Sequence, residues 1–183
     1  KDDSSKLFCQ VLGRSYGSEN VIGSHIWKHE TKGEGLDDFG IASTEIDSER
    51  NGLILCKGIE EAFDCLRVCF LYDFTKQALV LHVADPCLMD QIIVPSSSRT
   101  FRQIDGHELR CPKDKLPYRR LLSWHAYCVL EKFNKLGDFK PFHRLSGAEK
   151  GYAFPESGES SAIMAMVKTG ADVSDDDGDH GDK

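Results

Sequence analysis

A strand, loop, strand and helix pattern between residues 21 and 64 most constrains the fold of this chain. "VIGSHIW" is typical of a strand that carries His25 near its end, and a long polar loop follows it. "NGLILC" is a second short strand that opens with Asn51, and residues 59–66 have the apolar spacing of a helix. Glu60 and Asp64 are four residues apart, so both carboxylates point from one face of that helix.

These residue types fit a metal ion beside a general base. Carboxylates at this spacing suit Mg²⁺, Mn²⁺ or Ca²⁺ better than zinc, and a cation between them removes their mutual repulsion. A histidine side chain can take a proton from water near neutral pH, as a general base must, and His25 is the candidate for that role. Simpler interpretations stay open, because an acidic pair on a helix commonly faces solvent and an isolated histidine is commonly structural. His29, four residues after His25, is a candidate second metal ligand, although a place on the loop surface is the simpler interpretation.

The remaining pattern predicts an α+β fold. Residues 7–13 and 21–27 are expected to pair as a hairpin, and residues 28–50 to form an exposed loop with one helical turn near residues 41–46. "VCFLYD" and "ALVLHVAD" predict a second hairpin, and "IDGHEL" carries an Asp-Gly hairpin signal. Apolar residues recur at helical steps from Pro117 to Leu136, with Gly137 at the end, and His125 lies on the apolar face of this helix.

Seven cysteines without a Cys-x-x-Cys pair predict free, mostly buried thiols and a reducing, intracellular compartment, with the nucleus as one option. A small zinc-stabilised domain is the weaker alternative. The longest apolar stretches are strand-sized, which predicts no contact with a membrane. Because the first residue is Lys1, we expect a processed chain or an excised domain.

Charge is distributed unevenly along the 183 residues, whose net charge is −7. Residues 156–183 hold two lysines against eight acids, and we expect residues 141–183 to be an irregular, mostly disordered acidic tail. Residues 99–150 hold twelve Lys and Arg against six acids, a balance that suits a polyanion, although solvated surface is the simpler interpretation. We expect nucleic-acid contacts from six basic residues, which are Arg50, Lys57, Arg99, Arg102, Arg119 and Arg120.

"SHI", "RNGLILC" and "IEEAFD" together resemble the HNH (ββα-metal) endonuclease superfamily, in the branch with Ser/Ala-His-Ile, Asn-Gly-Leu and Phe-Asp motifs. The resemblance implies a ββα-metal core, which we place within residues 1–98 together with extra antiparallel hairpins. From the charge and the helical spacing we expect a basic segment with a long C-terminal helix over residues 99–140, packed on this core. The resemblance also implies that His25 is the general base and that Asn51 holds the loop or contacts the metal. Glu60 stands where relatives have a metal-binding histidine, and Ser24 stands where many have an acid.

The expected function is hydrolysis of phosphodiester bonds in DNA, with RNA as a further candidate. One divalent metal, Mg²⁺ or Mn²⁺, is expected on Glu60 and Asp64. The alternative is a catalytically degenerate HNH-like module that binds nucleic acid or a protein partner, and the departures at Ser24 and Glu60 favour it.

Overall fold

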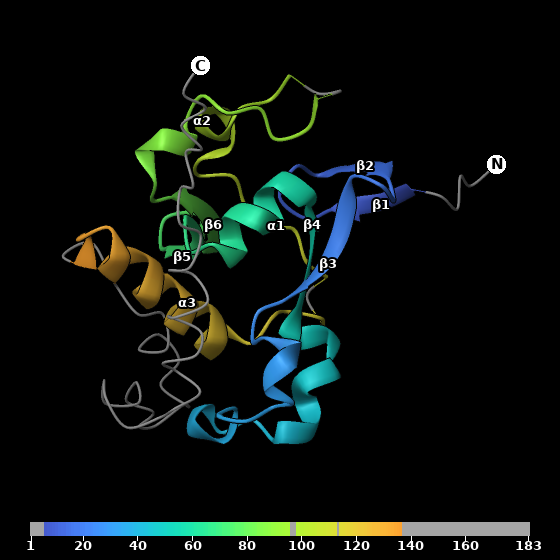
Figure 1. Cartoon of the computed structure of the whole chain (residues 1–183), viewed down its shortest axis with the longest axis vertical. Coiled ribbons are helices and arrows are strands. Elements are labelled where there is room, and N and C mark those ends of the chain that lie inside the picture. The colour runs from blue at the N-terminus through green and yellow to red at the C-terminus, as the bar shows by residue number, and fades with distance from the viewer. Residues whose placement is uncertain (1–5, 96–97, 113, 137–183) are drawn as a thin grey trace, which may run out of the picture.

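Antiparallel strand pairs and short helices make up the computed structural model, which describes residues 6–95, 98–112 and 114–136 (Figure 1). It is a mixed α/β fold. Within these residues the paired strands are β1 (Lys6–Cys9) with β2 (Arg14–Gly17), β3 (Val21–His25) with β4 (Gly52–Cys56), and β5 (Val68–Asp73) with β6 (Ala78–Val83). The α-helices are α1 (Lys57–Asp64), α2 (Phe101–Ile104) and α3 (Arg119–Lys132). The 3-10 helices are η1 (His29–Thr31), η2 (Asp37–Phe39), η3 (Ser43–Asp47), η4 (Glu49–Asn51) and η5 (Pro86–Leu88).

The first hairpin differs from the predicted one. Residues 7–13 do not pair with residues 21–27; instead β1 pairs with β2, in the register Lys6↔Gly17 to Cys9↔Arg14. The reason is Gly13, whose φ of 64° closes a tight turn that a residue with a Cβ adopts only with strain. A Cβ there would also lie 2.2 Å from a guanidinium nitrogen of Arg110. The chain therefore reverses direction directly after β1, and β3 pairs with β4 instead of with β1.

β3, β4 and α1 follow one another in the order that the sequence predicts. The β3–β4 register runs from Val21↔Cys56 to His25↔Gly52. α1 begins directly after β4, and its buried residues Ile59, Ala62 and Phe63 recur at helical spacing. The helix starts and ends two residues earlier than predicted. Its other face carries Glu60, which is only partly buried.

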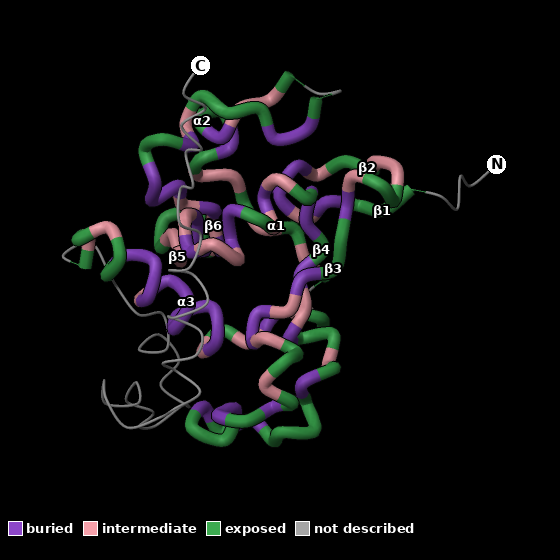
Figure 2. Tube along the Cα trace, viewed as in Figure 1, coloured by how far each residue is buried: buried purple, intermediate pink, exposed green. Residues whose placement is uncertain are grey.

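The segment between β3 and β4 is less exposed than the sequence indicated. It forms four successive 3-10 helices, and its residues Leu36, Phe39, Ile41 and Ile46 are buried. The Phe39 ring lies 5.4 Å from Trp27 and 6.2 Å from Trp124 of α3, measured between ring centroids. This aromatic row ties the segment to α3, although much of its outer surface remains exposed (Figure 2).

The β5–β6 hairpin is confirmed, with the register Val68↔Val83 to Asp73↔Ala78. α3 packs against β5 and is buried along most of its length (Figure 2). His125 of α3 is buried, as predicted, and its ring stacks on Phe63 of α1 with centroids 3.7 Å apart. Its Nε2 lies 2.9 Å from the Phe63 carbonyl oxygen. One hydrophobic core therefore includes residues of β3, β4, α1, β5 and α3.

The predicted hairpin at "IDGHEL" is wrong in part. The segment just before it forms the short helix α2, because Thr100 and Gln103 make a capping box at its N-terminus. After Gly106, which has a φ of 78°, the chain pairs instead with β6 through a bridge between Val80 and Glu108. The acidic tail, expected over residues 141–183, lies outside the described residues. Among the described helices, none is both long enough and apolar enough to cross a membrane.

Candidate active site

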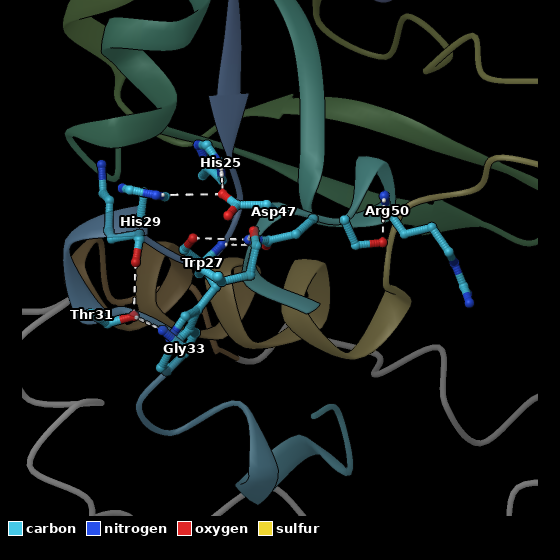
Figure 3. Close-up of polar contacts among 11 residues, drawn as sticks. His25, Trp27, His29, Thr31, Gly33, Asp47 and Arg50 are labelled. Carbon is cyan, nitrogen blue, oxygen red and sulfur yellow. Dashed lines mark hydrogen bonds and ion pairs between the residues drawn. The ribbon is translucent and has the colours of Figure 1, made fainter. Parts of the chain in front are cut away.

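His25 is the last residue of β3, and the long β3–β4 connection begins directly after it. Strand alternation turns its side chain away from the face on which Ser24 points inward, and 39% of the His25 side chain is exposed. Its Nε2 lies 3.8 Å from Oδ1 of Asp47, which belongs to η3 (Figure 3). This separation is too long for a hydrogen bond, so the attraction between the two groups is electrostatic.

Asp47 also faces a second imidazole. The Nε2 of His29 lies 3.4 Å from the same Oδ1, and the rings of His25 and His29 are 5.4 Å apart between centroids. Figure 3 shows the two rings converging on the carboxylate from β3 and from η1. His29 was expected mainly at the loop surface, with a ligand role as the alternative, and Asp47 was not among the predicted site residues. The only signal for Asp47 was its position as an acid four residues before Asn51.

The side chain of Asn51 holds the backbone on both sides of this group. Its Oδ1 accepts the N–H of Trp27 at 2.8 Å. Its Nδ2 donates to the carbonyl oxygens of Trp27 at 3.1 Å and Ile46 at 2.8 Å. Trp27 lies between His25 and Lys28, and Ile46 precedes Asp47, so one buried amide fixes both segments. These hydrogen bonds use both amide hydrogens of Asn51, so its side chain holds the loop in place.

Glu60 and Asp64 extend from α1, and the cation beside them is Lys28. The Nζ of Lys28 pairs with Oδ2 of Asp64, and the exposed fractions of the two side chains are 25% and 33%. Partial burial raises the pKa of Glu60, and the neighbouring charge of Asp64 raises it further, while Lys28 opposes the shift. The two carboxylates thus form a negatively charged site that already holds a positive charge.

Ser24 does not lie at this site. It pairs with Leu53 across the β3–β4 hairpin, and it is 4% exposed. Its hydroxyl is buried and has no hydrogen-bond partner among the described residues. The position before His25 therefore offers no ligand beside the imidazole.

The basic residues that were expected to bind nucleic acid lie in separate places. Arg50 points away from His25 in Figure 3, stacks over the Tyr118 ring at 4.4 Å, and donates to the Leu116 carbonyl at 3.1 Å. Arg102 forms two hydrogen bonds with Asp90, at 3.0 and 3.2 Å. Arg120 donates to the Phe39 carbonyl, whereas Arg119 and Lys57 are exposed at the first positions of α3 and α1.

Arg99 lies at a surface hollow on the side of the molecule that carries α2. This hollow, of about 410 Å³, is lined by Ser98, Arg99, Gln103 and His107. His107 also lines an adjoining hollow of about 320 Å³, to which Lys76 and Arg110 contribute positive charge and Glu108 a negative one. Positive charge therefore accumulates around His107, where Lys76 and His107 were not predicted from the sequence.

A family model described as HNH endonuclease matches residues 9–71, about a third of the chain. The matched segment runs from β1 to β5 and contains His25, Asp47, Asn51, Glu60 and Asp64. Residues 9–71 belong to the HNH superfamily. The predicted resemblance to the superfamily is confirmed, whereas the match does not test the branch with its three motifs. The superfamily is generally one of nucleases, which act on nucleic acid. Neither the comparison with curated proteins nor the comparison with solved structures found a match.

The donor set of the HNH segment fits a divalent cation with few protein ligands. Within the described ranges, no group of three or more His, Cys, Asp and Glu side chains is arranged to hold a metal. Glu60 and Asp64 nevertheless present hard oxygen donors from one helix face, and the ammonium of Lys28 stands where a cation would be held. Mg²⁺ commonly binds through one or two carboxylates and keeps its remaining ligands as water or substrate phosphate. The pair is compatible with that mode of binding.

Proposed function

We propose that this chain is a metal-dependent endonuclease that hydrolyses phosphodiester bonds in DNA. His25 is the general base, and Glu60 and Asp64 of α1 hold one divalent metal, Mg²⁺ or Mn²⁺. In this proposal β3, β4 and α1 are the ββα-metal core of the HNH segment. The observation that carries it is the contact between His25 and Asp47 within that segment, with Nε2 and Oδ1 3.8 Å apart.

His25 has the chemistry and the access that a base requires. With Nε2 turned toward Asp47, the carboxylate favours the tautomer that keeps its proton on Nε2. Nδ1 then has the lone pair that accepts a proton from water, and the partial exposure of the ring lets water reach it. The carboxylate of Asp47 stabilises the imidazolium that forms, and Asn51 keeps the two segments in place.

Hydrolysis at this site also requires a positive charge close to the phosphate group that is cleaved. A divalent cation on Glu60 and Asp64 would neutralise charge that develops on the phosphate oxygens and on the leaving oxygen. Elsewhere on its surface, the chain itself supplies binding groups. Lys57 is exposed at the start of α1, and Arg99 lies with other cations at the hollows around His107. Such groups attract the backbone of a nucleic acid without regard to its sequence.

Nicking of supercoiled plasmid tests the proposal. The full chain should nick DNA with Mg²⁺ or Mn²⁺ and stop when EDTA is added. His25→Ala should lower the rate about 10²- to 10⁴-fold, which is the usual contribution of a general base. His29→Ala is the matched comparison, because it removes the other imidazole on Asp47 and should cost less than about tenfold. Full cleavage by a folded His25→Ala protein would disprove the assignment of the base.

A degenerate HNH module that binds nucleic acid or a protein partner without cutting is the second candidate. Two observations favour it: Asp64 is occupied by Lys28, and Ser24 is buried where many relatives carry an acid. This candidate predicts DNA binding that is unchanged by His25→Ala and no nicking with any divalent metal. The same plasmid assay, combined with a binding titration, separates it from the nuclease.

A further inference from the structure

Lys28 is held firmly at its backbone while its side chain reaches the helix that carries the carboxylates. It follows Trp27, whose N–H and C=O are both bonded to Asn51. The carbonyl oxygen of Lys28 accepts the N–H of Thr31 at 3.1 Å and its hydroxyl at 2.8 Å. From this fixed point the ammonium pairs with Asp64, and both side chains are more than half buried.

The ammonium and a metal ion compete for the same negative charge. Glu60 and Asp64 lie one turn apart and repel each other unless a cation is close. Lys28 supplies one positive charge from within the chain, at the high effective concentration that a tether gives. A free Na⁺ or K⁺ carries the same charge without the tether. Mg²⁺ or Mn²⁺ carries twice the charge and accepts oxygen atoms from both carboxylates.

We propose that Lys28 determines which cations the Glu60–Asp64 pair accepts. Its ammonium occupies the pair in the absence of metal, excludes monovalent cations, and yields only to a divalent cation. The identity of that cation rests on the proposed function, but the competition itself requires only the acidic pair. Lys28 is thus a specificity-determining residue of the site, and it weakens the binding of every metal that enters.

Binding of Mn²⁺ to the full chain, followed by electron paramagnetic resonance, tests this inference. Lys28→Met keeps the length of the side chain and removes its charge. It should tighten Mn²⁺ binding about tenfold, because an opposite charge this close to a carboxylate typically shifts its affinity for a cation by that order. Lys32→Met is the matched control, since Lys32 is an exposed lysine four residues further along the same connection. It should change Mn²⁺ affinity by less than about twofold.

A second measurement uses the unmodified protein, in case Lys28→Met does not fold. Nuclear magnetic resonance of the lysine ammonium groups should show one signal that moves to the position of exposed lysines as Mg²⁺ is added. Lys28→Arg identifies that signal by its loss. NaCl at matched ionic strength should leave the signal in place, because a monovalent cation does not displace the ammonium.

Clear results would overturn the inference. Equal Mn²⁺ affinity in the native protein and in Lys28→Met would do so, and so would a Lys28 signal that stays unmoved while Mg²⁺ binds. Absence of Mn²⁺ binding by both proteins would also reject it. None of these measurements needs cleavage of DNA. Suppose that the native protein does not nick DNA but that Lys28→Met binds Mn²⁺ more tightly than the native protein does. That result would support this inference and disprove the proposed nuclease function.

Discussion

Asn51 holds both backbone polar groups of Trp27 with one side chain. Its Oδ1 accepts the Trp27 N–H at 2.8 Å, and its Nδ2 donates to the Trp27 carbonyl at 3.1 Å. The other amide hydrogen goes to the carbonyl of Ile46 at 2.8 Å. Because Asn51 is fully buried, these bonds are shielded from water. They link the backbone that follows His25 to the backbone that precedes Asp47.

Asn51→Ala should therefore destabilise the fold and separate His25 from Asp47. The substitution leaves one buried N–H and two carbonyl groups without the partners they have now. We expect the free energy of unfolding to fall by roughly 2–4 kcal/mol, since each unsatisfied buried group costs about 1–3 kcal/mol. Urea unfolding measures this change. Asn20→Ala is the control, because the Asn20 amide bonds the side chain of Glu19 at the surface, and its effect should stay below about 0.5 kcal/mol. Equal effects of the two substitutions would contradict the holding role of Asn51.

Asp47 should contribute to cleavage but not to stability. Its side chain is 72% exposed, so Asp47→Ala should change the free energy of unfolding by less than about 0.5 kcal/mol. Without the carboxylate, the imidazolium that forms when His25 takes up a proton is no longer stabilised, and we expect the nicking rate to fall by about tenfold or more. Asp38→Ala, an exposed acid of the same connection, should leave the rate unchanged. A rate in Asp47→Ala equal to that of the native protein would remove Asp47 from the site.

Arg99 should contribute more to DNA binding than Arg102. Arg99 lines the hollow around His107, next to the hollow lined by Lys76 and Arg110, so positive charge accumulates there. The charge of Arg102 is offset by Asp90, which accepts two hydrogen bonds from its guanidinium. Arg99→Gln should weaken binding and reduce the salt slope of log K by about 1, the effect of losing one phosphate contact. Arg102→Gln should leave the slope nearly unchanged. Affinity titrations across a range of NaCl concentrations measure both slopes, and the reverse order would place the nucleic acid on another face.

His125 should make the protein less stable in acid. Burial lowers the pKa of His125 to about 3, against about 6.5 for a free imidazole. The folded protein keeps this ring neutral while the unfolded chain takes up a proton, so its contribution is fully present above pH 6.5 and is lost as the pH falls toward about 3. The loss should be roughly 1.4 kcal/mol per pH unit within that window.

Urea unfolding at several pH values tests the role of His125. Its replacement by Gln keeps a donor for the Phe63 carbonyl and removes the titrating ring, so the acid slope should become shallower than in the native protein. Asn20→Gln, a surface substitution that changes no titrating group, should leave the slope as it is. Identical slopes for native protein and His125→Gln would show that the ring titrates normally.

Several parts of the fold followed from local sequence pattern. Two strand-sized apolar segments predicted β5 and β6, and helical spacing predicted α1 and placed His125 on a buried face. The sequence pattern between residues 21 and 64 indicated the HNH superfamily, which the family model for residues 9–71 confirms. These features depend on neighbours within one strand or one helix, where side-chain direction repeats every two residues or every 3.6 residues.

Pairings over longer distances were not accessible in this way. Residues 7–13 were expected to pair with residues 21–27, but β1 pairs with β2 instead. This pairing depends on the left-handed turn at Gly13 and on Arg110, which packs over that turn. The helix α2 replaced part of an expected hairpin because a capping box outweighed the Asp-Gly signal. The basic residues of the middle segment do not form one cluster, because Arg102 bonds Asp90 and Arg120 bonds the Phe39 carbonyl oxygen.

The sequence by itself determined the membership of residues 9–71 in the HNH superfamily and the elements that carry His25, Glu60 and Asp64. Only the tertiary structure decided what faces those residues. Asp47 reaches His25, and Lys28 reaches Asp64, because Asn51 folds the β3–β4 connection back onto the strand ends. Contacts of this kind depend on how a connection of more than twenty residues closes. No local period encodes that closure, and buried hydrogen bonds and aromatic packing select it.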